Sequence, residues 1–104
     1  MPKIKIVTIA NGATLSDSAL LTGDIKFIGI PASMTGTTLK IHASMDNTTW
    51  SVVKDTAGND VSITIGSAIA WIPTHSLNLQ GLRNVKLLSG SAETGAKVIS
   101  IITE

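Results

Sequence analysis

The sequence predicts an all-β fold, and two observations lead to that prediction. The first is composition: the 104 residues include 14 Ile and 13 Thr, whereas aromatic residues make up only 3%. β-Branched side chains pack well on a pleated strand and lose χ1 freedom in a helix. The second is spacing, since short apolar or alternating runs recur about every ten residues with turn residues between them. About eight such runs are typical of an antiparallel β-sandwich or barrel.

The stretch 39–65 predicts a three-stranded meander. In residues 39–43 apolar side chains alternate with polar ones, so a strand would place the apolar ones on one face. The polar runs 46–49 and 55–60 supply short side chains that favour turns. Trp50 has the same parity as the apolar residue two positions on, so we expect it to point into the core.

The rest of the chain predicts further short strands. Residues 14–22 are expected to form one helical turn capped by Ser16 or Asp17. In the second strand, Ile25 and Phe27 alternate with a lysine, so both are expected on one face. The meander contributes predicted strands at residues 39–44, 50–52 and 61–65. The other predicted strands are residues 3–10, 24–30, 68–72, 82–88 and 97–103.

The first strand has apolar residues on both sides. Ile4 and Ile6 lie at even positions, whereas the apolar residues Val7 and Ile9 lie at odd ones. In a strand these two pairs would point to opposite faces, which predicts a bulge or two covered faces near Ile6. Lys3 and Lys5 alternate with these isoleucines, so we expect them on a solvated face.

Length and charge exclude several classes of protein. The chain fits a single domain, residues 1–104. The net charge is +1 and no Lys or Arg cluster is present, so no nucleic-acid partner is expected. The absence of cysteine excludes disulfides and thiolate metal sites. No secretory signal is expected in the alternating first residues, and no run of about 18 apolar residues predicts a membrane span.

The same composition favours association with other subunits. Hydrophobic residues make up 43% of the chain and charged residues only 14%. A monomer of this composition would expose large apolar patches, so we expect one face to be covered by a neighbour.

The sequence predicts no reactive centre. His42 and His75 are isolated imidazoles, whereas even a catalytic zinc needs three protein ligands, so no metal site is expected. No GxSxG, GxGxxG or P-loop motif occurs, so we expect no catalytic residue, no cofactor and no enzyme activity. Residues 55–60 lack the terminal glutamate of a calcium loop and are interpreted as a turn. Trp50 and Trp71 are assigned to the core or a subunit interface, in preference to stacking on a sugar.

Three segments carry hairpin motifs in a distinctive order: LSDSALLTGDIKFIGIP at 15–31, LKIHASMDNTTWSVVKDTAGNDVSI at 39–63 and LRNVKLLSG at 82–90, with Ile72-Pro73 before the last. This order resembles a set of small tailed-phage virion proteins. In those proteins a Leu-x-Gly … Ile-x-x-Pro strand precedes an Ala-Ser-x-Asp-Gly hairpin and an Asp-x-x-Gly-Asn turn. Asn47 stands where that family tends to have glycine.

The resemblance implies a jelly-roll-like sandwich that decorates or cements the outer surface of a phage capsid. It implies contact with the major capsid protein as a homo-dimer or homo-trimer, no cofactor, no membrane contact, and a place on the virion after assembly in the host cytoplasm. No family motif marks the contact residues. An edge strand offers unpaired backbone groups, so we place the subunit or capsid contact at Lys3, Ile4, Lys5, Ile6 and Trp71.

The alternative is a carbohydrate- or receptor-binding module of a phage tail or fibre. The segment ASMDNTTW at 43–50 also resembles hairpins in discoidin-like sandwiches.

Overall fold

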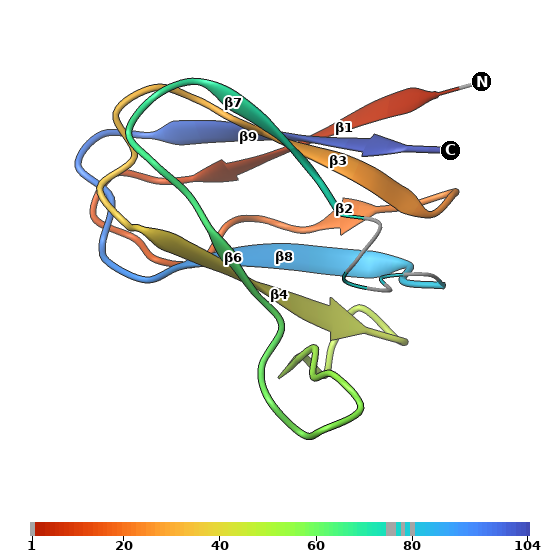
Figure 1. Ribbon diagram of the computed structural model, residues 1–104. Coiled ribbons are helices and arrows are strands. Elements are labelled where there is room, and N and C mark those ends of the chain that lie inside the picture. The colour runs from red at the N-terminus through yellow and green to blue at the C-terminus, as the bar shows by residue number, and fades with distance from the viewer. Residues whose placement is uncertain (1, 75–76, 78, 80) are drawn as a thin grey trace.

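The computed structural model describes residues 2–74, 77, 79 and 81–104, and these form two antiparallel sheets that face each other (Figure 1). No α-helix occurs among these residues. The strands are β1 (Lys3–Ile9), β2 (Ala19–Leu20), β3 (Ile25–Ile30), β4 (Thr38–Ser44), β5 (Ser51–Val52), β6 (Ser62–Thr64), β7 (Ala70–Pro73), β8 (Asn84–Ser89) and β9 (Lys97–Thr103). The all-β prediction is therefore confirmed.

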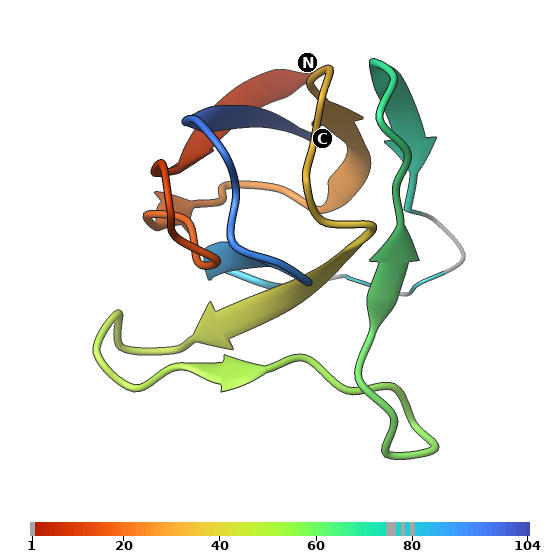
Figure 2. The ribbon, with the colours of Figure 1, turned by 90° about the vertical axis from the view of Figure 1, so that its left-hand side faces the viewer.

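The strands pair as a nested series. The first strand pairs with the last, β2 with β8, β3 with β7, and β4 with both β5 and β6. Strand β8 occupies one edge of β4, so β5 and β6 lie along its other edge as one interrupted strand. Four nested antiparallel pairs folded into two sheets define a jelly roll. Sheet A has the order β1-β9-β3-β7, and sheet B has β2-β8-β4 followed by β5 and β6 (Figure 2).

The core lies between the inner faces of the two sheets. Each sheet contributes side chains from alternate positions, as the pleat requires. The side chains with no exposed surface include Ile9, Ile28, Ile99 and Ile101 from sheet A and Leu39, Ile41 and Leu87 from sheet B.

The expected helical turn at residues 14–22 is wrong, because this segment is extended and contains β2. Ser16, one of the two expected caps, bonds across to β8: its amide donates to the Leu87 carbonyl at 2.9 Å and its Oγ accepts the Leu87 amide at 2.9 Å. These bonds to a neighbouring strand replace the local bonds of a helix.

Strand β1 is regular, so of the two alternatives predicted near Ile6 the bulge is wrong, and two covered faces stay a prediction. Its pairing with β9 runs without a break from Lys3–Thr103 to Ile9–Lys97. Lys3 and Lys5 share a side with the buried Ile9, where the strand runs past the end of the core. The isoleucines at positions 4 and 6, and not these lysines, therefore occupy the outward side of β1.

A bulge occurs instead in β3. The pairing with β9 shifts between Ile25 and Phe27, so Lys26 is the extra residue. The bulge places Ile25 in the core, 5% exposed, and Phe27 on the outer face, 41% exposed, against the expectation that both share a face.

Strand β7 extends through Pro73, one residue beyond the predicted strand end. The Thr74 amide donates to the Lys26 carbonyl on β3 at 3.1 Å. Since successive amides point to opposite edges, the nitrogen of Pro73 faces the open edge of the sheet, where no donor is needed.

The orientation of β1 can be tested with two alanine substitutions. We expect Ile9→Ala to lower the free energy of unfolding by about 2–5 kcal/mol, because it leaves a cavity in the core. Ile6→Ala, three residues away and 58% exposed, should change it by less than about 0.5 kcal/mol. Urea unfolding monitored by circular dichroism measures both values, and the reverse order would refute the register of β1.

Candidate functional site

The outer face of sheet A is apolar across all four strands. Directly paired residues on neighbouring strands point to the same side of a sheet. One row across the sheet is therefore Ile4–Ile102–Phe27–Pro73, and the next is Ile6–Ser100–Gly29–Trp71. We call this surface the apolar face, and define it as Ile4, Ile6, Thr8, Phe27, Gly29, Trp71, Pro73, Val98, Ser100 and Ile102.

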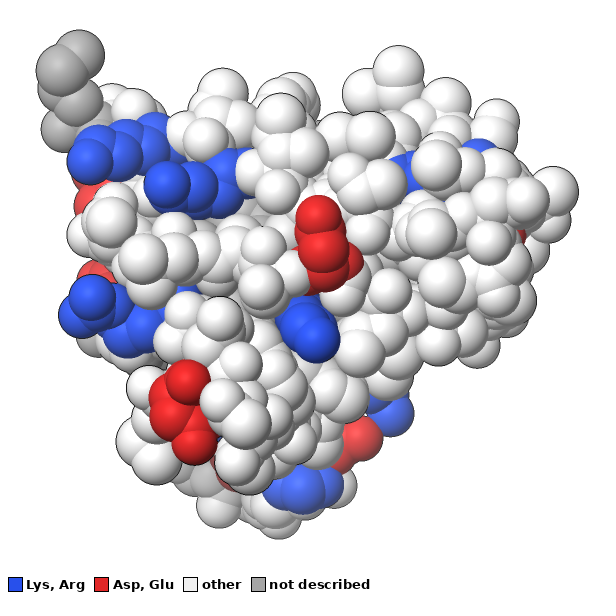
Figure 3. Space-filling model, turned by 180° about the vertical axis from the view of Figure 1, so that it is seen from behind, with Lys and Arg blue, Asp and Glu red and all other residues white. Residues whose placement is uncertain are grey.

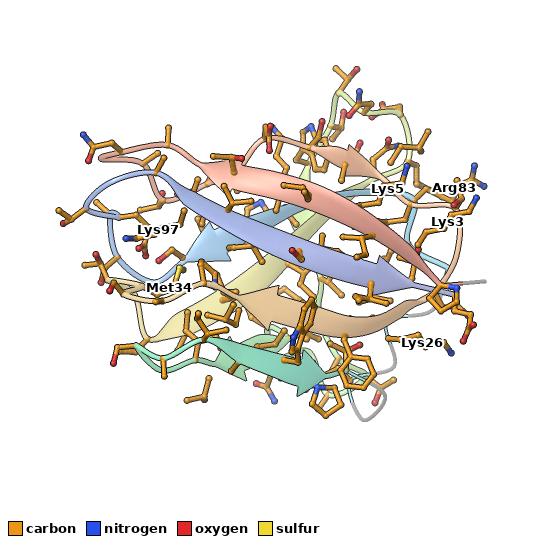
Figure 4. The ribbon with its side chains drawn as sticks, turned by 90° about the horizontal axis from the view of Figure 1, so that it is seen from above. Lys3, Lys5, Lys26, Met34, Arg83 and Lys97 are labelled. Atoms are coloured by element: carbon orange, nitrogen blue, oxygen red, sulfur yellow. The ribbon has the colours of Figure 1, made fainter. Side chains whose placement is uncertain are left out.

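The apolar face carries no ionisable side chain, although its large residues are open to solvent. Ile4 is 60% exposed, Trp71 55% and Val98 49%. Figure 4 looks onto this face, and the labelled Lys3, Lys26 and Lys97 lie at its two ends. A contiguous apolar patch on a protein surface usually marks a site of interaction.

Gly29 allows Trp71 to lie across the middle of the apolar face. A Cβ atom at Gly29 would collide with the six-membered ring of the Trp71 indole. The indole thus covers the backbone of β3, an arrangement in which an aromatic side chain shields a strand glycine.

The outer face of sheet B is polar in contrast. Lys40 and Lys54 both bond the carboxylate of Asp60, at 2.9 and 2.6 Å. The hydrogen bonds from Lys54 and then Lys40 lower the pKa of Asp60 from 3.8 to about 2. The Lys86 ammonium lies 4.6 Å from the centre of the Trp50 ring. The two outer faces of the sandwich therefore differ in charge: that of sheet B carries ionised side chains, and the apolar face carries none. Seen from behind, the molecule shows large areas of uncharged surface between its charged groups (Figure 3).

The free edge of β1 is open over its first half. The Thr8 amide donates to Asp17 Oδ1 at 2.8 Å, and the Thr8 carbonyl accepts the Asp17 amide at 3.2 Å. These two groups point away from β9, and backbone groups alternate between the edges of a strand. The amides and carbonyls of Ile4 and Ile6 therefore also point away from β9, and no backbone partner for them is found in the described part of the chain.

The structure brings three of the five predicted contact residues onto the apolar face: Ile4, Ile6 and Trp71. Lys3 and Lys5 lie on the other side of β1, along the same edge. Phe27, Val98 and Ile102 belong to the same surface and were missed. The sequence signal for them was that residues 24–30 and 97–103 are apolar at both even and odd positions, so that both faces of each strand would carry apolar side chains.

Trp50 is half-buried on the outer side of sheet B, so its predicted place in the core is wrong, and the alternative of a subunit interface stays a prediction. Val52, two residues after Trp50, pairs with His42 of β4, and His42 pairs with Lys86, so this row faces outward. The pattern of the strand alone could not show which of its two faces meets the core.

The described polar side chains mainly hold turns. Asp46 accepts the amides of Thr49 and Thr48 and the hydroxyl of Ser44, which lowers its pKa from 3.8 to about 2. Residues 55–60 form a turn as expected, with Gly58 at a φ of 87°. His42 is half-buried on sheet B, and His75 lies outside the described residues.

Among the described residues, no group of three or more His, Asp or Glu side chains is placed to hold a metal ion. The same residues contain no helix long and apolar enough to cross a membrane.

A cleft of about 320 Å³ lies beside the turn between β4 and β5, next to residues 81–83. Met45 and Arg83 line it together with Asp46, whose carboxylate is already bonded within the turn. The cleft therefore brings no free pair of acid and base groups together.

Glu93 is a buried carboxylate that ties two loops together. It is 1% exposed, and its oxygens accept the Thr35 amide at 2.8 Å, the Gly36 amide at 2.9 Å and the Ser89 hydroxyl at 2.7 Å. Burial raises the pKa of Glu93, but the three hydrogen bonds lower it by more, so that it lies below its ordinary value of 4.5. Glu93 thus joins the loop after β3 to the loop before β9, away from the apolar face.

No family model matches the chain, and no curated protein matches it. The fold and the surface together define a jelly-roll sandwich with one apolar outer face.

Replacing the buried carboxylate tests its structural role. We expect Glu93→Gln to lower the free energy of unfolding by about 1–3 kcal/mol at neutral pH, because the amide cannot accept all three hydrogen bonds. Folding lowers the pKa of Glu93, so its contribution is complete above pH 4.5 and is lost as the pH falls through the folded-state pKa.

The difference between wild type and Glu93→Gln should therefore be constant well above pH 4.5 and shrink below it. Urea unfolding at a series of pH values measures this difference. A difference that grew on acidification would contradict the assignment.

Proposed function

We propose that the protein is a structural virion protein that decorates or cements the outer surface of a phage capsid. The observation that carries the proposal is the apolar face, in which ten positions on four strands include no ionisable side chain. The motif order at residues 15–31 and 39–63 supports the phage assignment by its resemblance to small virion proteins. In this proposal the partner is the major capsid protein, and the virion surface is the location.

The energetics favour repeated rather than single contacts. Fully burying a large apolar side chain contributes about 1.5–3 kcal/mol, so a half-exposed one contributes roughly 1 kcal/mol more when covered. Five such side chains would give roughly 5 kcal/mol, which is similar to the cost of about 4–15 kcal/mol for bringing two proteins together. A dimer or trimer on a capsid lattice makes several contacts at once, and these reinforce one another.

The role is mechanical. Each copy would bridge neighbouring capsid subunits and oppose their separation under internal pressure. The proposal requires no catalysis, cofactor, nucleic acid or membrane, and it places assembly in the host cytoplasm.

Binding to expanded heads of the phage that encodes the chain tests this proposal. We expect the purified protein to bind these heads and raise the temperature at which they rupture. Ile6→Asp should weaken binding about 100-fold or more, since a carboxylate would be buried without a partner. Leu20→Asp is the matched control, because Leu20 is 54% exposed but lies on the outer side of sheet B.

Sedimentation of heads with labelled protein measures binding, and light scattering during heating measures rupture. Equal rupture temperatures with and without the protein would refute the cementing role. Equal losses for the two aspartate variants would refute the assignment of the apolar face.

Glycan binding in a tail or fibre is the second candidate, and one observation favours it. The Trp71 indole is 55% exposed and is held over Gly29, as a stacking platform for a sugar ring would be.

Under this alternative, purified surface polysaccharide of the host should shift the tryptophan emission in a saturable way. Trp71→Ala should remove the shift, whereas Trp50→Ala, on the other sheet, should leave it. The absence of any saturable shift would exclude this candidate.

A further inference from the structure

We propose that the free edge of β1 binds an extended segment of a partner protein in which acidic and apolar residues alternate. This inference rests on the proposed function, because it names the chemistry of the partner segment beside the apolar face. It is carried by the open backbone of β1 together with the charges along that edge.

The backbone geometry provides the docking site. Asp17 covers the edge at Thr8 through two hydrogen bonds, and no further backbone hydrogen bond to this edge is found among the described residues. Toward the N-terminus, Ile4 and Ile6 present two amides and two carbonyls to an incoming strand. An extended chain that pairs with them would lengthen sheet A by one strand.

The side chains of β1 determine the composition of that strand. Paired residues share a side of the sheet, so the partner residues beside Ile4 and Ile6 would extend the apolar face and should be apolar. The residues between them would lie beside Lys3 and Lys5, on the opposite side. Alternate acidic residues would pair with these lysines.

The end of the sandwich that holds the termini carries charges of both signs, because the carboxylates of Asp24 and Glu104 lie there beside the lysines of β1. Figure 4 shows Lys3, Lys5 and Arg83 together at this end. Glu104 lies beside Lys3 in a shallow hollow. The ion pairs found among the described residues join Lys40 and Lys54 to Asp60, so none engages the three cations at this end.

The same lysines disfavour a second copy of the chain as the occupant. The antiparallel register that pairs Ile4 with Ile6 of a copy brings the two Lys5 side chains directly opposite each other. Like charges in that position destabilise a strand pair, and lysine on an edge strand protects against self-association. A partner strand with acidic residues removes this repulsion, so the edge discriminates between the two occupants.

Synthetic peptides test the proposal. The probe is a labelled seven-residue peptide in which valine and glutamate alternate, and the comparison peptide has lysine in place of glutamate. We expect saturable binding of the acidic peptide, at least about tenfold weaker binding of the basic one, and slower hydrogen exchange of the Ile4 and Ile6 amides on binding. The double variant Lys3→Glu, Lys5→Glu should reverse the preference.

Lys26→Glu is the matched control, since Lys26 lies at the same end but on β3, away from the β1 edge. It should keep the preference for the acidic peptide. Equal binding of the two peptides by the wild-type protein, or unchanged exchange at Ile4 and Ile6, would overturn the proposal even where a variant failed to fold. Self-association of the wild-type protein that slowed exchange of the same amides would also overturn it.

Head binding separates this inference from the proposed function. If wild type and the double lysine variant bind heads equally, the edge inference fails and decoration stands. If the acidic peptide binds with protection of Ile4 and Ile6 while heads are not bound, decoration fails and the edge site stands.

Discussion

The pairing of the first strand with the last is the constraint on which the rest of the structure depends. Seven consecutive residues of β1 pair with β9 without a break, and β9 pairs in turn with β3. This register places Ile9 in the core and Ile4 and Ile6 outside. A slip of one residue would exchange the two sets, because side chains alternate between the faces of a strand. The apolar face and the open edge beside it both follow from this one register.

The two sheets of the sandwich share one core but face different surroundings. Sheet B has lysines, a histidine and an ion-paired aspartate on its outer side, as is common for a sheet that faces water. Sheet A has apolar residues on both sides, a pattern usually found in strands that are covered on both faces. The bulge at Lys26 and the glycine under Trp71 bring Phe27 and the indole onto this outer surface. Sheet A therefore offers two features to the proposed contacts, the apolar face and the open edge of β1.

Three carboxylates stabilise turns and loops that lie outside the apolar face. Asp46 and Asp60 hold the projecting region between β4 and β6, and the carboxylate of Glu93 fastens loops at the end of the sandwich opposite the termini. Each of these carboxylates has a lowered pKa because donors surround its charged form. Their hydrogen bonds are satisfied within the chain, whereas Lys3 and Lys5 on β1 form no ion pair with the residues that the structure describes.

The sequence by itself determined the all-β class, the approximate strand positions and the turn at residues 55–60, because alternation and turn chemistry are local properties. It also indicated surplus apolar surface, since Ile4 and Ile6 have the wrong parity for the core that Ile9 enters. Only the tertiary structure decided which parity faces inward, that Trp50 lies outside, and that Ser16 bonds to β8 instead of capping a helix. These outcomes depend on partners that are distant in the chain, such as β9 for β1 and β8 for residues 14–22. An alternating pattern does not show which of the two faces of a strand is buried. That is decided by the position of the opposing sheet.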